Sequence, residues 1–141
     1  MASLLSIEHD RAWATKVNES VRARMPTAVV RGWALRHVAR GAASLGGDES
    51  GVAFSAYVNA TLPRDSFDFV SVDGRARSAC LERVWNEGLV APGGLLLLDN
   101  SYRAKYRAAR ARFDENWVKV EFDAAKIVHP DAATALWCRN N

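Results

Sequence analysis

The sequence predicts an α/β fold: a mostly parallel sheet with helices on both faces, followed by a C-terminal antiparallel hairpin. Two observations predict it. Residues 67–72, 75–87 and 95–98 read in order as an alternating strand, an amphipathic helix and a fully apolar strand, which is a βαβ unit. The crossover of such a unit leaves its two strands parallel. Residues 118–122 and 134–138 then alternate as strands on either side of a loop, which indicates a hairpin.

The N-terminal part is expected to contribute a strand and a helix. Residues 4–7 form a short apolar run typical of a buried strand. Asp10 is the expected N-cap of a helix from about residue 11, because its carboxylate can accept from free N–H groups of the first turn, and Pro26 ends that helix. Residues 27–38 are ambiguous between strand and loop. The core-facing stripe of the helix, spaced at i, i+4 and i+8, is predicted to be Trp13, Val17 and Val21.

The C-terminal half shows clearer boundaries. The strand at 67–72 stops at Asp73, and the helix predicted over 75–87 ends at Gly88. Residues 92–94, Pro-Gly-Gly, predict a tight turn before the strand at 95–98. Another helix is expected over residues 102–113. The buried face of the helix at 75–87 is predicted to consist of Cys80, Leu81, Val84 and Trp85.

Composition describes an ordinary globular chain. With 49% apolar and 25% charged residues among 141, we expect a single domain over residues 1–141. There is no apolar run of the ~20 residues that a membrane helix needs, and no basic leader, so neither a membrane span nor a secretory signal is indicated. The two cysteines lack metal-ligand spacing, which favours a reducing, cytoplasmic setting.

Acidic residues end three of the predicted strands. Glu8, Asp73 and Asp99 each follow an apolar run directly. In open parallel sheets, ligands bind beyond the carboxyl ends of the strands, so three acidic ends at one edge predict a ligand site. The alternative is structural: a strand-end aspartate also forms turns or caps the next helix, as Asp73 and the pair Asp99 and Asn100 would do here.

Five segments together resemble the class I S-adenosylmethionine-dependent methyltransferases. Residues 5–10, with Glu8 at the strand end, look like that family's second strand. Residues 67–74 are similar to its fourth strand, and 89–100, with the Pro-Gly-Gly turn, to its fifth. Residues 117–122 and 132–139 look like its last antiparallel pair. The resemblance implies a Rossmann-like sheet and S-adenosylmethionine as cofactor.

The resemblance also implies roles for the acidic strand ends. In the family, the carboxylate at the position of Glu8 accepts from the ribose hydroxyls of the cofactor. Asp73 is the second predicted cofactor-binding residue, and Asp73 and Asp99 would lie near the reacting end. Asp73 is the predicted catalytic residue, orienting a small-molecule acceptor. Asp73, Asp99 and Asn100 also resemble the Mg²⁺ ligands of some O-methyltransferases, since hard oxygen ligands suit that ion. No lysine follows Asp73 closely, which departs from the O-methyltransferase pattern.

One part of the family pattern is missing. The family binds the cofactor on an acidic-x-Gly-x-Gly loop after its first strand, whereas residues 46–51 hold the only clustered glycines before residue 67. These follow Glu8, which is the wrong order. In the family's strand order, 3-2-1-4-5-7-6, the missing strand is central, so its neighbours must pair directly or leave ladder groups unpaired. We interpret the chain as a truncated product, one whose start is misplaced, or a degenerate domain.

Two other functions are consistent with the sequence. The first is an inactive interaction module, either oligomeric or paired with a partner chain that supplies the missing strand. The second is a nucleic-acid-binding domain that uses the basic helix at 102–113. Nucleic acid is disfavoured, because the net charge is only +3 and the arginines fall on a face opposite the apolar residues. The predicted apolar stripe is Tyr102, Tyr106, Ala109 and Phe113, and the basic face Arg103, Arg107 and Arg110.

Overall fold

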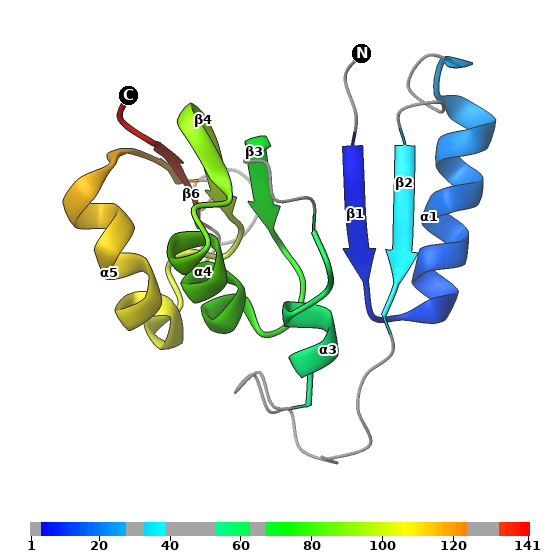
Figure 1. Cartoon of the computed structure of the whole chain (residues 1–141), viewed down its shortest axis with the longest axis horizontal. Coiled ribbons are helices and arrows are strands. Elements are labelled where there is room, and N and C mark those ends of the chain that lie inside the picture. The colour runs from blue at the N-terminus through cyan, green and yellow to red at the C-terminus, as the bar shows by residue number, and fades with distance from the viewer. Residues whose placement is uncertain (1–3, 28–32, 39–52, 63–66, 124–132) are drawn as a thin grey trace. The chain divides into compact units, whose positions relative to one another are not determined.

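The computed structural model describes residues 4–27, 33–38, 53–62, 67–123 and 133–141. The chain divides into two compact units (Figure 1). The first unit comprises residues 1–48 and 52–61, and the second comprises residues 49–51 and 62–141. No helix among the described residues has both the length and the apolar character needed to cross a membrane.

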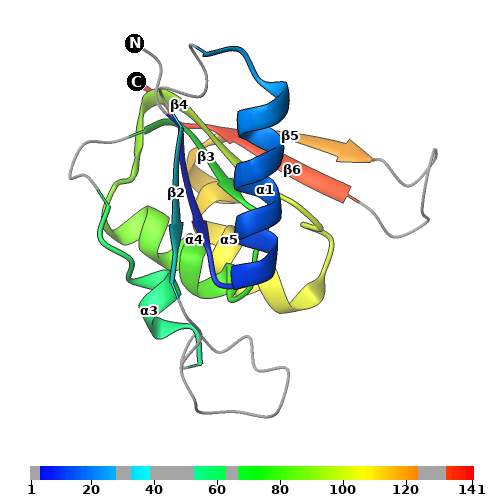
Figure 2. The ribbon, with the colours of Figure 1, turned by 90° about the vertical axis from the view of Figure 1, so that its right-hand side faces the viewer.

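The first unit contains a two-stranded parallel sheet. Strand β1 (Leu4–Glu8) pairs with β2 (Trp33–His37) in a register that sets Glu8 opposite His37. The strand expected at residues 4–7 is therefore confirmed, and the ambiguous stretch contains a second one. Helix α1 (Arg11–Arg24) lies along this sheet (Figure 2), and a short helix, α3 (Ser55–Val58), follows later.

Helix α1 begins and ends where the sequence predicts, but one of the residues predicted to face the core does not. Asp10 Oδ1 accepts a hydrogen bond from Trp13 N at 2.9 Å, and the helix stops before Pro26. The Trp13 side chain is 52% exposed, whereas Ala14 is buried. One residue along a helix turns the side chain by about 100°, so a stripe that starts at Ala14 leaves Trp13 outside it.

The second unit is a four-stranded mixed sheet in the order β3-β4-β6-β5. Strands β3 (Phe67–Val72) and β4 (Val90–Leu98) are parallel. Strands β5 (Val118–Asp123) and β6 (Ala133–Cys138) form the predicted antiparallel pair, and β6 also pairs antiparallel with β4. The predicted α/β class, with parallel strands followed by an antiparallel pair, is confirmed.

The Pro-Gly-Gly segment is part of β4, not a turn that precedes it. Phe67 lies opposite Val90 and Phe69 opposite Leu95, so the register shifts between them and residues 91–94 bulge. Gly93 takes a φ of +74° within this bulge. A bulge adds residues to one strand without ending it. The expected irregularity is therefore present at these residues, but the strand continues through it.

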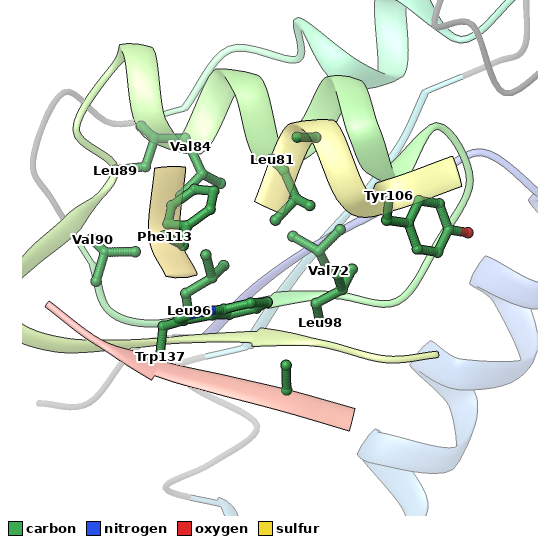
Figure 3. Packing of buried hydrophobic residues seen from close by; sticks show 12 residues of the cluster. Val72, Leu81, Val84, Leu89, Val90, Leu96, Leu98, Tyr106, Phe113 and Trp137 are labelled. Atoms are coloured by element: carbon green, nitrogen blue, oxygen red, sulfur yellow. The ribbon is translucent and has the colours of Figure 1, made fainter. Parts of the chain in front are cut away.

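Three helical segments cover one face of this sheet: α4 (Arg77–Asn86), the 3-10 turn η1 (Ala104–Tyr106) and α5 (Arg107–Asn116). Figure 3 shows Leu81 and Val84 of α4 and Phe113 of α5 directed toward Leu96 and Trp137 of the sheet. The predicted stripe of α4 is confirmed, since Cys80 and Trp85 pack against the same cluster.

The helix predicted over residues 102–113 begins later in the structure than the sequence predicts. Residues 102 and 103 precede η1, and the regular helix begins only at Arg107. Tyr102 is therefore not a core residue as predicted: its side chain is 42% exposed, while Tyr106, Ala109 and Phe113 are buried. Periodicity alone cannot show that the first turn of an apolar pattern is non-helical, because i+4 spacing persists in the sequence regardless.

Strands β1 and β3 are each the edge of their sheet. Among the described strands, β1 pairs only with β2 and β3 only with β4. Val72 O accepts from Asp99 N on the β4 side, so the backbone groups of the alternate residues Phe69 and Ser71 point toward the open edge.

Candidate functional site

Two predicted site residues meet at the carboxyl edge of the second unit's sheet. Val72 and Leu98 are paired in the parallel register, so the residues that follow them, Asp73 and Asp99, emerge side by side. Asn100 comes next with a φ of +53°. The predicted grouping of Asp73, Asp99 and Asn100 is therefore present in the fold.

An arginine that no sequence motif singles out connects all three side chains. Arg77 Nη2 lies 3.1 Å from Asp73 Oδ1, and Nη1 lies 3.3 Å from both Asp99 Oδ2 and Asn100 Oδ1. Its side chain is only 10% exposed, whereas that of Asp73 is 65% exposed. The signal that could have revealed it is its spacing, since Arg77 follows Asp73 by four residues, at the start of α4.

Arg77 also binds the backbone of the same edge. Nε donates to Gly74 O at 2.9 Å, Nη2 donates to Asp73 O at 3.2 Å, and Nη1 donates to Asp99 O. The ring of Tyr106 lies 5.9 Å from the guanidinium carbon. Each of the three guanidinium nitrogens thus has at least one acceptor, and the group is held by charge, hydrogen bonds and an aromatic ring together.

The two carboxyl groups of this cluster differ electrostatically. Partial burial and the neighbouring Asp99 carboxyl raise the pKa of Asp73, against the opposing charge of Arg77. Burial alone would raise the pKa of Asp99, but hydrogen bonds with Asp73 and Thr134 and the charge of Arg77 lower it overall. Thr134 Oγ1 donates to Asp99 Oδ1 at 3.1 Å. Asp99 is therefore the carboxylate that keeps its charge, and Asp73 the one that takes up a proton more readily.

The structural alternative for these residues holds only in part. Neither aspartate caps a helix: α4 starts from Ala76, in a left-handed conformation, and η1 from Arg103, and neither start has a side-chain cap. Asn100 does form a turn, because its carbonyl accepts from Arg103 N at 3.3 Å. The side chains of Asp73 and Asp99 are thus directed to Arg77 and not to a helix end.

This arrangement does not fit a divalent cation. Mg²⁺ needs about six oxygen ligands at about 2.0–2.1 Å in an octahedron. One side-chain oxygen each of Asp73, Asp99 and Asn100 instead already accepts from Arg77. Within the described part of the chain, no group of three acidic, histidine or cysteine side chains could hold a metal ion. The predicted Mg²⁺ site stays a prediction, and the position of Arg77 weighs against it.

Glu8, the predicted ribose ligand, lies at the end of β1 in the first unit. Its Oε1 accepts from His9 N at 2.7 Å and from Asp10 N at 2.8 Å, and it lies 2.9 Å from His9 Nδ1. These bonds fix the turn from β1 into α1. Among the described residues, none forms a hydrogen bond with the other oxygen, Oε2, so one carboxylate oxygen is left to accept from a ligand.

Aromatic rings surround the residue beside Glu8. The His9 ring packs edge-to-face on Phe54 at 5.1 Å and on Tyr57 at 5.6 Å, and His37 Nε2 lies 3.2 Å from His9 O. Sequence patterns do not reveal this group, because its members are far apart in the chain and share no spacing. A carboxylate beside aromatic rings suits a ligand that combines hydroxyl groups with a flat heterocycle.

On α4, Cys80 is a partly buried thiol whose reactivity can be predicted. Burial raises the pKa of Cys80 to about 11, although the charges of Arg83 and Arg77 act to lower it. Because only the thiolate reacts, we expect native Cys80 to react with iodoacetamide at pH 8 roughly a hundredfold more slowly than in urea-unfolded protein. Mass spectrometry of the alkylated peptides measures this, and equal rates in both states would contradict it.

Solved structures provide the comparison with known proteins. The chain matches the O-methyltransferase TomG of Streptomyces achromogenes, involved in tomaymycin synthesis and solved with S-adenosylmethionine, with a TM-score of 0.61 and 16% identity. It matches a putative O-methyltransferase from Klebsiella pneumoniae with a TM-score of 0.63 and 16% identity. It also matches an O-methyltransferase from Bacillus cereus, in complex with SAH, with a TM-score of 0.62 and 11% identity.

The matches cover nearly all of this chain but only part of each solved structure. In each, 99% of this chain is covered, but only 63% of the other chain, so the chain spans less than two thirds of their length. No protein-family model matches the sequence, and no curated protein does either. At such low identity the likeness establishes the fold alone. On that evidence, the chain has the Rossmann-like fold of the class I S-adenosylmethionine-dependent methyltransferases.

Proposed function

We propose that this chain binds S-adenosylmethionine and serves in methyl transfer to a small-molecule acceptor. The observation that carries the proposal is the strand order. The sheets read β2-β1 and β3-β4-β6-β5. These match the strands 3-2 and 4-5-7-6 of the methyltransferase order, with the first strand absent from the described residues. Glu8, Asp73 and Asp99 follow the same strands as the acidic residues of that family.

The roles follow from the exposed oxygens of each site. When bound, S-adenosylmethionine supplies an electrophilic methyl group for in-line displacement. Glu8 Oε2 accepts from a ribose hydroxyl, and the rings beside His9 border the base. Asp73, the more exposed carboxyl of its cluster, accepts a hydrogen bond from the acceptor and orients it. Asp99 stays with Arg77 and Thr134 and keeps Asp73 in place.

Calorimetry with S-adenosylmethionine tests the proposal. We expect Glu8→Gln to weaken binding by about 10–100-fold, because a hydrogen bond to a charged group contributes about 1.5–3 kcal/mol. Glutamine keeps an oxygen to accept from His9 N and Asp10 N, so the turn into α1 is preserved.

The matched control is Glu19→Gln, at an exposed position on α1, which should leave the affinity unchanged. Absence of any binding by well-folded wild-type protein would overturn the cofactor proposal. Unchanged affinity in Glu8→Gln would overturn the ribose assignment while leaving the cofactor proposal in place.

A second candidate function is an interaction module completed by another strand. It is favoured by the open edge of β3, where Phe69 is exposed and the backbone of Phe69 and Ser71 points outward. The same calorimetry separates the two, since binding of S-adenosylmethionine by the monomeric chain excludes the need for a partner strand.

The nucleic-acid alternative gains no support from the basic helix. Arg110 donates to Ser101 O at 2.6 Å and lies 3.6 Å from Asp114, and Arg112 donates to Asn86 Oδ1 at 3.3 Å. Both arginines have partners within the fold, and Asp114 offsets the charge of Arg110 on the predicted basic face.

A further inference from the structure

We propose that Arg77 is the resident cation of the carboxylate cluster and takes the position that a divalent metal would need, so that the site of Asp73, Asp99 and Asn100 works without a metal ion. The proposal concerns these side chains alone and holds whether or not the chain transfers methyl groups.

The first argument is geometric. The three side chains that would supply oxygens to a metal converge on one guanidinium, at 3.1 Å for Asp73 and 3.3 Å for Asp99 and Asn100. A cation placed among these oxygens would lie against a group of the same sign. Metal binding therefore requires Arg77 to leave first.

The second argument concerns how firmly Arg77 is held. A surface arginine can swing into solvent, but the Arg77 side chain is enclosed and donates to the carbonyls of Asp73, Gly74 and Asp99. Its departure would leave these carbonyls without their donor and would remove its contact with the Tyr106 ring. A planar guanidinium group that donates hydrogen bonds in several directions is difficult to displace.

The third argument concerns charge. Two adjacent carboxylates at a partly buried sheet edge repel each other unless a cation lies between them. Arg77 supplies that charge from α4, within hydrogen-bond distance of both. The cluster carries one net negative charge in this state and leaves the exposed Asp73 carboxyl as a hydrogen-bond acceptor.

A consequence follows for the acceptor, and it rests on the proposed methyl transfer. A metal centre would chelate two neighbouring oxygens of an acceptor, as Lewis acids do. A carboxyl held by an arginine instead binds a single hydrogen-bond donor, such as one hydroxyl or amine. The expected acceptor class is therefore one with an isolated donor group.

Titration with Mn²⁺, followed by calorimetry and by electron paramagnetic resonance, tests the proposal without any cofactor or acceptor. We expect no Mn²⁺ binding by the wild type at millimolar concentration. Arg77→Ala frees the three oxygens and should bind Mn²⁺ at least tenfold more tightly. The melting temperature of Arg77→Ala should also rise with Mn²⁺, while that of the wild type stays constant.

Arg83→Ala is the matched control, because Arg83 lies on the same helix but pairs with Glu87. It should behave as the wild type. If Arg77→Ala does not fold, Arg77→Met keeps the apolar stem and is measured in the same way. Mn²⁺ binding by the wild type that Asp73→Asn abolishes would overturn the proposal, as would the failure of folded Arg77 variants to gain binding.

Discussion

Replacing Trp137 by alanine is expected to lower the free energy of unfolding of the second unit by about 3–5 kcal/mol. Trp137 lies near the C-terminal end of β6, fully buried, with its ring centroid 5.8 Å from that of Phe113. Its Nε1 donates to Asp114 Oδ1 at 3.0 Å. Asp114 keeps Lys119 at 3.2 Å, so the loss comes mainly from the cavity and not from an orphaned charge.

Urea unfolding followed by circular dichroism measures this effect. Val120→Ala is the matched control, since Val120 lies on the neighbouring strand with an exposed side chain and its truncation removes little buried area. Trp137→Phe should fall between the two. If Trp137→Ala lowers the free energy of unfolding no more than Val120→Ala does, packing of the Trp137 ring does not stabilise the core as expected.

The second large effect is expected at Gly94, within the bulge of β4. A Cβ at this position would lie 2.9 Å from Ala91 O, 3.0 Å from Asp68 O and 2.9 Å from a methyl carbon of Val90. Two of these atoms belong to the backbone and cannot turn aside. We expect Gly94→Ala to lower the free energy of unfolding by about 2–3 kcal/mol, at the upper end for overpacked sites.

Gly88→Ala provides the comparison for this prediction. Gly88 has a φ of +62°, but the Cβ that alanine would add there has no neighbouring atom within 4 Å, so alanine meets backbone strain without crowding. That strain amounts to about 1 kcal/mol. Urea unfolding of both variants separates the effects, and an equal loss in the two would contradict the crowding at Gly94.

The elements can be predicted where local patterns decide them. Apolar runs bounded by acidic residues indicate the ends of β1, β3 and β4, and hence the positions of Glu8, Asp73 and Asp99. Periodicity gives the spacing of a buried stripe but not which face turns inward. For that reason the predicted core includes Trp13, and it includes Tyr102 because periodicity does not show where the helix starts; both side chains are exposed.

The site can be predicted only as far as its acidic members. Strand ends of a parallel sheet meet by topology, so Asp73 and Asp99 can be brought together from sequence. The spacing of four residues between Asp73 and Arg77 is only a weak signal, because an arginine at the start of an amphipathic helix is ordinarily solvated. Only the folded chain shows that it turns toward three backbone carbonyls and two carboxyl groups.

The open edge of β3 affects the solubility of the chain. Phe69 on this strand shares a face of the sheet with Val118, through Leu95 and Cys138, and Phe69 and Val118 are both exposed. An edge strand beside exposed apolar side chains is a template for aggregation. Asp68, exposed on the same strand, opposes stacking of identical chains by placing like charges together. Removing that charge, as in Asp68→Asn, therefore favours precipitation of the concentrated protein.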